Sequence, residues 1–186
     1  MWTRATWHEC ADELDEVCQA FRNAYWGRRH GSRWPRDPDD EVEMVEVSKQ
    51  AVQLLRALAL AVRSEQDFDL VPNAAAVVGA LKEEGVTPSD AGEVKRRKGY
   101  APMLGTDGYA KLDLRQALNK IAHADPRSAD YYVGPMNTAH DLLLYGTSRG
   151  RPWFAVISLL ELVKAIRALP DATIEMRSTG AQLLSG

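Results

Sequence analysis

The chain of 186 residues has little cysteine, no long apolar run and no excess of basic charge. Its two cysteines, Cys10 and Cys18, would lie about 12 Å apart along one helix, too far for a disulfide within one chain. No stretch approaches the roughly 18 apolar residues of a membrane-spanning helix, and the N-terminus lacks the apolar segment of a signal peptide. The net charge of −3 means that any nucleic-acid contact must come from local basic patches. We therefore expect a cytoplasmic protein with reduced thiols and no membrane contact.

Several motifs of cofactor-dependent and metal-dependent chemistry are also missing from the sequence. It contains no P-loop, no GxGxxG and no GxSxG, and its four histidines do not have metal-ligand spacing. The acidic residues 39–41 suit the positive end of a helix dipole and need no metal to explain them. We therefore expect no metal and no cofactor.

The residues that are present predict a helical protein. Hydrophobic residues make up 45% of the chain and charged residues 26%, as in ordinary globular proteins, and the length suits one domain. Helical spacing of apolar residues, with capping residues and Gly or Pro stops, predicts helices over residues 6–26, 38–66, 73–84, 113–124 and 158–169. Two short apolar runs at 141–145 and 153–157, separated by GTSRGRP, predict a hairpin with a loop. The predicted fold class is mainly α: a bundle of four to five helices with a small C-terminal β-hairpin. Residues 1–170 would form the single domain and residues 171–186 a disordered tail.

The segment DLRQALNKIAHA, residues 113–124, carries the most distinctive pattern. Arg115, Asn119 and His123 follow one another at intervals of four and lie on one slowly drifting helix face. Asp113 and Gln116 form a variant capping box at the start of this helix. The row should therefore run along the edge of the core.

An arginine and a histidine on one face suit cleavage of RNA at the 2′-hydroxyl. His123 could move a proton, Arg115 could hold the phosphate, and Asn119 could orient either group. Arg115 and His123 are about 12 Å apart in axial rise, so convergence on one phosphate would need a bend or a second subunit. The alternative is structural: His123 is a satisfied packing residue, and Arg115 pairs with an acid of the second helix.

This row resembles the signature helix of HEPN-type domains, small all-helical bundles of toxin, antiphage and RNA-processing systems. The usual family motif places the Arg and the His closer together than the seven residues that separate them here. The Arg-x3-Asn-x3-His form of some divergent HEPN-like families does match Arg115, Asn119 and His123. The resemblance covers about a dozen residues and the general helical layout. It implies a helical, homodimeric, metal-independent ribonuclease of a bacterial defence or toxin-type system.

Three basic clusters are candidate nucleic-acid contacts, because arginine serves phosphate and an aromatic ring serves base stacking. The residues are Arg28, Arg29, Arg33, Trp34 and Arg36 in the first cluster, Lys95, Arg96, Arg97 and Lys98 in the second, and Arg149 and Arg151 in the third. Their alternative interpretation is a solvated, charged surface.

Two functional hypotheses follow. In the first, the protein binds RNA and cleaves it without a metal, with Arg115, Asn119 and His123 as the catalytic residues. In the second, it is a non-catalytic helical module that dimerises or docks a protein partner. A DNA-binding regulator is disfavoured, because no recognition helix is evident.

Overall fold

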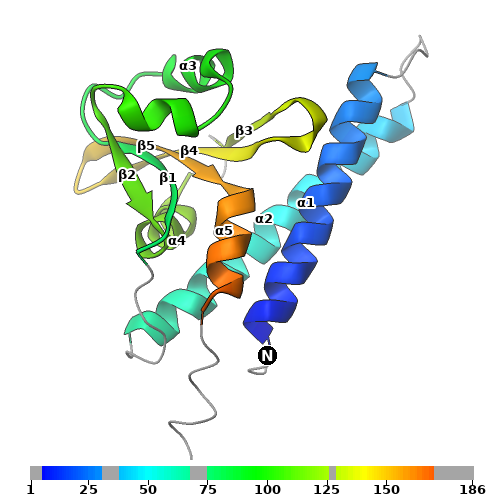
Figure 1. Ribbon diagram of the computed structural model, residues 1–186, viewed down its shortest axis with the longest axis horizontal. Helices are drawn as coiled ribbons and strands as arrows, with labels where there is room; N and C mark the ends of the chain where they lie inside the picture. The colour runs from blue at the N-terminus through cyan, green and yellow to red at the C-terminus, as the bar shows by residue number, and fades with distance from the viewer. Residues whose placement is uncertain (1–5, 31–37, 68–74, 126–128, 170–186) are drawn as a thin grey trace, which may run out of the picture.

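A five-stranded antiparallel sheet lies at the centre of the protein, between two unequal groups of helices (Figure 1). The computed structural model describes residues 6–30, 38–67, 75–125 and 129–169. The predicted helical bundle with a small C-terminal hairpin is therefore wrong, and the fold combines helices with a full sheet. The elements are α1 (Thr6–His30), α2 (Pro38–Asp67), β1 (Val77–Lys82), α3 (Asp90–Arg97), η1 (Ala101–Gly105), β2 (Tyr109–Asp113), α4 (Leu114–His123), β3 (Asp130–Val133), η2 (Pro135–Asn137), β4 (His140–Ser148), β5 (Arg151–Ser158) and α5 (Leu159–Arg167).

The sheet has the order β2-β1-β5-β4-β3, and every neighbouring pair is antiparallel. The last six residues of β5 and the middle four of β1 are buried, which fits strands that are covered on both faces. Apolar side chains on the two faces form separate clusters. One face packs against α1, α2, α4 and α5, and the other packs against α3 and η1.

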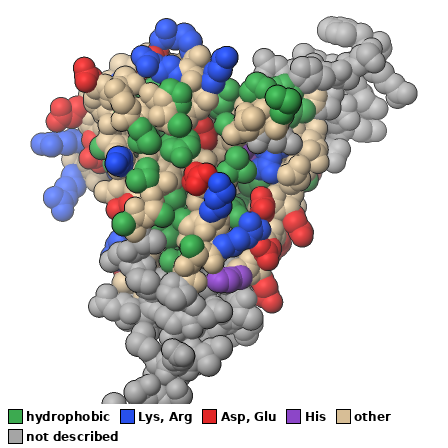
Figure 2. All heavy atoms as spheres, viewed as in Figure 1, with side chains coloured by type: hydrophobic (Ala, Val, Ile, Leu, Met, Phe, Trp, Pro, Cys, Tyr) green, Lys and Arg blue, Asp and Glu red, His purple; other side chains and the backbone are tan. Residues whose placement is uncertain are grey.

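The helices on the larger side form two layers. α4 and α5 cover the sheet, while α1 and α2 run in opposite directions across them, with α2 against α4 and α1 against α5 (Figure 1). Figure 2 shows acidic side chains gathered along α1, next to a group of basic ones. Arg167 of α5 is part of this pattern, since it pairs with Asp12 and Asp15 of α1. None of the helices in the described ranges has the length and apolar character needed to cross a membrane.

Most of the expected helices are present, but two segments were predicted wrongly. Residues 73–84 were expected to be a helix, yet 77–82 form β1, a central strand. No element was predicted between the fourth helix and the hairpin, yet Asp130–Val133 forms the edge strand β3. The first helix continues through Gly27 to His30, and the hairpin turn has two residues, Arg149 and Gly150, rather than a longer loop. The predicted tail from residue 171 lies outside the described residues.

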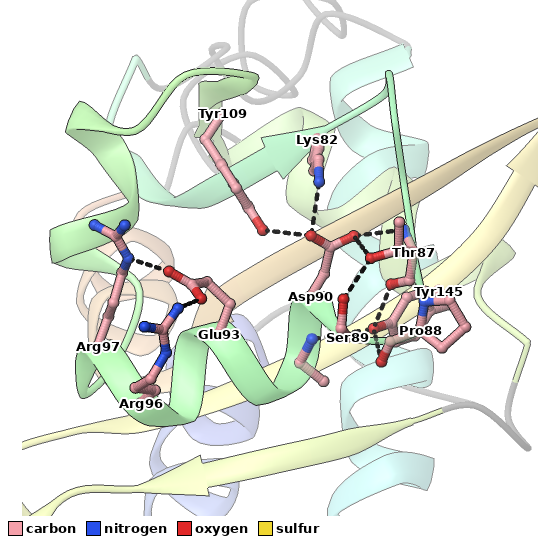
Figure 3. A network of polar contacts seen from close by, with 11 residues as sticks. Lys82, Thr87, Pro88, Ser89, Asp90, Glu93, Arg96, Arg97, Tyr109 and Tyr145 are labelled. Carbon is pink, nitrogen blue, oxygen red and sulfur yellow. Dashed lines mark hydrogen bonds and ion pairs between the residues drawn. The ribbon is translucent and has the colours of Figure 1, made fainter.

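A buried carboxylate fixes the start of α3 on the smaller side of the sheet (Figure 3). Asp90 is 6% exposed and accepts a hydrogen bond from the backbone N–H of Thr87 at 2.7 Å. The ammonium of Lys82 on β1 lies 2.7 Å from the same carboxylate, and the hydroxyl of Tyr109 on β2 donates to it at 3.2 Å. Charge-assisted bonds of this kind join α3 to both strands.

Candidate functional site

The helix α4 begins directly after β2 and carries the predicted Arg, Asn and His row. Asp113 caps it as expected: its carboxylate accepts the Gln116 N–H at 2.7 Å, and the Gln116 amide oxygen accepts the Asp113 N–H at 3.2 Å. The apolar face of the helix is buried, and it consists of Leu114, Ala117, Leu118 and Ile121. The polar row is therefore held at the edge of the core by local capping and by packing against α2.

Arg115 and His123 contact different residues of α2. The guanidinium of Arg115 lies 2.6 Å from a carboxylate oxygen of Asp67, the last residue of α2. His123 instead meets Arg63, one turn earlier in α2, with 3.1 Å between Nη1 and Nε2. Arg63 also pairs with Asp67, at 3.7 Å. The four side chains thus form a continuous series across two helices: Arg115, Asp67, Arg63 and His123.

This arrangement confirms that Arg115 pairs with an acid of the second helix. It also brings an arginine to the histidine, but that arginine is Arg63, which the sequence analysis did not single out. The available signal was the i, i+4 spacing of Arg63 and Asp67, which predicts a pair on one helix face. Nothing local in the sequence indicates that this face would meet α4.

The contact with Arg63 defines the hydrogen-bonding state of His123. A guanidinium has only donors, so the imidazole Nε2 must accept, and the ring proton is then on Nδ1. Nε2 is consequently the atom that could receive a proton if Arg63 turned to another acceptor.

Asn119 and His123 line a hollow of about 610 Å³ between α4 and the β4–β5 turn, here named the α4 hollow. Its other polar and aromatic lining residues include Glu83, Lys120, Arg149 and Trp153. Lys120 pairs with Glu83 at 3.1 Å, and its ammonium lies 4.6 Å from the ring centre of Trp153. The hollow therefore combines basic groups, an amide, an imidazole and an indole.

The β4–β5 turn places Arg149 at the rim of this hollow. Arg149 and Gly150 both have positive φ, 51° and 76°, as the two central residues of a type I′ turn require. Arg151, the other predicted contact in this loop, lines an adjoining hollow of about 580 Å³ that shares Glu83, Arg149 and Trp153. The third basic cluster is thus brought to the α4 side of the sheet.

The other two basic clusters are not brought to the α4 hollow by any described contact. Lys95, Arg96 and Arg97 end α3, on the opposite side of the sheet, and Lys98 is its left-handed C-cap. Arg96 and Arg97 pair with Glu93, while Lys95 pairs with Asp130 at 2.6 Å. Arg28 and Arg29 belong to the last turns of α1, but their side chains lie outside the described part, as do Arg33, Trp34 and Arg36.

Other titratable groups are structural in character. Burial raises the pKa of the Cys10 thiol to about 11 and that of Cys18 to about 12, so both remain protonated and pack as small apolar groups. Among the described residues, no group of three or more His, Cys, Asp or Glu side chains is arranged to hold a metal ion.

Comparison of the chain with protein-family models, curated proteins and solved structures gave no match. The comparisons therefore neither support nor refute the resemblance to HEPN-type domains.

Proposed function

We propose that the protein binds single-stranded RNA in the α4 hollow and cleaves it without a metal ion. The observation that carries this proposal is the direct contact between Arg63 and His123, at 3.1 Å, on the edge of a hollow large enough for part of a strand. A general base beside a guanidinium that can bind the phosphate is a pairing that suits phosphodiester cleavage.

The charges of the hollow favour a phosphate backbone. Lys120 and Arg149 line it, and Glu83, which is paired with Lys120, is its single acidic lining residue among those described. Arg63 stands beside it and shares the carboxylate of Asp67 with Arg115. The whole chain carries a net charge of −3, so these basic groups form a local patch rather than part of a general excess. Such patches attract nucleic acid in a salt-dependent manner.

The proposed reaction begins when a phosphate in the hollow draws the Arg63 guanidinium away from His123. Nε2 of His123 is then free to accept the proton of a ribose 2′-hydroxyl. The 2′-oxygen bonds to phosphorus, the bond from phosphorus to the 5′-oxygen breaks, and His123 returns its proton to that 5′-oxygen. The products are a 2′,3′-cyclic phosphate and a free 5′-hydroxyl.

The remaining residues of the row position these groups. Asp67 holds Arg63 and Arg115 at the same carboxylate, so it orients the guanidinium that faces His123. Asn119 lines the hollow one turn before His123, and its amide can donate to a phosphate oxygen. In this arrangement Arg115 is a positioning residue that acts through Asp67, and Arg63 is the phosphate clamp.

The test is incubation with a fluorescent single-stranded RNA in excess EDTA, with a DNA strand of the same sequence as the control that lacks 2′-hydroxyls. His123→Ala should abolish cleavage, because no other described group takes its place. Arg63→Ala should lower the rate by about 100-fold or more, as for loss of a group that stabilises transition-state charge, and Arg115→Ala should lower it less. Undiminished cleavage by His123→Ala, or a larger loss with Arg115→Ala than with Arg63→Ala, would contradict the assignment.

A homodimeric, non-catalytic module is the second candidate. The observation that favours it is that α2 exposes two apolar side chains, Leu60 at 61% and Val45 at 44%. Sedimentation of the wild type beside Leu60→Ser decides it: a dimer that the substitution dissociates, without RNA binding by either protein, favours the module.

A further inference from the structure

The indole of Trp153 forms the floor of the α4 hollow. Trp153 is only 2% exposed, yet it lines both the α4 hollow and the adjoining one. Its cross-strand partner is Gly146, and a Cβ at that position would collide with the indole ring. The glycine therefore lets the ring lie close against β4, with polar space beside it.

Lys120 of α4 is one of the side chains that cover this ring. The ammonium of Lys120 lies over the indole, 4.6 Å from the ring centre, where the ring quadrupole attracts it. Lys120 is also tied to Glu83 at 3.1 Å; the lysine side chain is 14% exposed and the glutamate side chain 62%, so the carboxylate of this ion pair is in solvent while the lysine lies mostly within the hollow. Lys120 is thus held over the ring by two interactions, one with the indole and one with Glu83.

We infer that Trp153 is a base-stacking platform, and that a nucleobase of a single strand displaces Lys120 from the indole to reach it. Stacking of a base on an aromatic side chain is at least as strong as a lysine–ring contact, so the exchange is energetically feasible. The displaced Lys120 stays beside the base, where its charge meets the phosphate of the same nucleotide. Arg149 and Arg151, which line the two adjoining hollows, would accompany the strand on either side of the platform.

This inference rests on the RNA binding proposed above and specifies what the strand must offer: an unpaired base next to a phosphate. A duplex, whose bases are already stacked, would not fit. It also gives Glu83 a role as the latch that keeps Lys120 over the ring when no strand is bound.

The experiment compares two strands that carry the same phosphates. One is a short 2′-O-methyl RNA, which cannot be cleaved through a 2′-hydroxyl, and the other is the same strand with abasic sugars. Binding is measured by anisotropy of a label on the strand and by tryptophan fluorescence. The intact strand should bind about tenfold more tightly than the abasic strand, in keeping with the loss of one stacked base, and it alone should quench Trp153.

Two variants keep the test decisive. Trp153→Phe should lose the quenching and reduce the preference for the intact strand, and its thermal unfolding shows whether it remains folded. Lys120→Ala keeps the indole but removes its cover. It should bind both strands more weakly, through loss of a phosphate contact, and yet prefer the intact strand by a larger ratio than the wild type does.

The outcomes separate the two proposals. If neither the intact nor the abasic strand binds, the proposed function and this inference are both overturned. Equal binding of intact and abasic strands, or an unchanged ratio in Lys120→Ala, would overturn the platform and leave RNA binding in place. Glu83→Gln weakens the ion pair that keeps Lys120 over the ring, so it should tighten binding of the intact strand severalfold. If the abasic strand also binds more tightly by the same factor, that result counts against the platform.

Discussion

Two neighbouring residues of β4 should make stability depend on pH in opposite directions. The side chain of His140 stacks on Phe21 of α1, with 5.4 Å between ring centres, and burial, aided by the charge of Arg22, lowers its pKa to about 3. Asp141 points to the other face of the sheet and accepts the backbone N–H of Tyr100 at 2.8 Å. Burial raises the pKa of Asp141 to about 6, despite that hydrogen bond.

The sizes of the two effects follow from these pKa values. Unfolded histidine has a pKa of about 6.5. Between pH 7 and pH 5 the unfolded chain therefore takes up a proton that folded His140 does not. This uptake favours the unfolded state and lowers the free energy of unfolding by about 2 kcal/mol. The stabilising contribution of His140 is therefore present above that pKa and lost as the pH falls. Asp141 does the reverse: the folded protein takes up a proton near pH 6 and the unfolded chain only near pH 4, a gain of about 1 kcal/mol over the same interval.

The assay is urea denaturation of the wild type, His140→Phe and Asp141→Asn at neutral pH and near pH 5. On acidification, His140→Phe keeps only the effect of Asp141 and should gain about 1 kcal/mol of unfolding free energy, relative to the contribution of all other groups. Asp141→Asn keeps only the effect of His140 and should lose about 2 kcal/mol on the same basis. The other carboxylates titrate in all three proteins, so their contribution cancels in the comparison. If His140→Phe and the wild type lose the same free energy between the two pH values, His140 is not held neutral by burial and the reasoning fails.

Two further predictions concern stability. Gly79→Ala would put a Cβ against a backbone carbonyl of β5 and should lower the free energy of unfolding by about 3 kcal/mol or more. Gly92→Ala on α3, where a Cβ meets nothing within 4 Å, should raise it by about 0.5–1 kcal/mol. Equal urea midpoints for the two variants would contradict this. Asp90→Ala leaves the ammonium of Lys82, which is only 16% exposed, without its carboxylate and should lower the free energy of unfolding by about 2–4 kcal/mol. Glu93→Gln removes the more exposed pairs of α3 and should lower it by less than about 1 kcal/mol in the same measurement.

The helices could be predicted where local signals decide the structure. The capping box of Asp113 and Gln116 forms as expected, because its partners are three residues apart. Ser158 caps α5 through the Glu161 N–H at the same separation. The apolar spacing of α5 also predicted its buried face correctly. In these elements the sequence contains both partners of each contact within one or two turns.

The sheet could not be predicted in the same way, because its strands pair over long distances in the chain. Residues 77–82 have apolar positions at helical spacing, but a short apolar run that is buried on both faces has the same appearance. Two Val residues followed by Gly79 were the available signal for a strand, since β-branched residues favour strands and an isolated glycine marks a close backbone approach. The edge strand β3 has polar and aromatic residues and no clear alternation, so only its pairing with β4 identifies it.

The candidate site shows the same division between local and distant information. The spacing of Asn119 and His123 was sufficient to place them on one edge of α4, and both line the hollow. The partners of His123 and Lys120, which are Arg63 on α2 and Trp153 on β5, come from segments that the helix pattern could not relate to α4.

The corrected geometry changes what the proposed reaction needs from a second subunit. In the sequence-based hypothesis, the axial distance between Arg115 and His123 called for a bend or for a second subunit. Arg63 reaches His123 within one chain, so a single subunit holds both the proposed clamp and the proposed base. Cleavage per molecule should therefore be independent of protein concentration well below the range in which any dimer forms. An activity that disappears on dilution, in step with dissociation measured by sedimentation, would show that the second copy supplies a reacting group and that Arg63 is not the clamp.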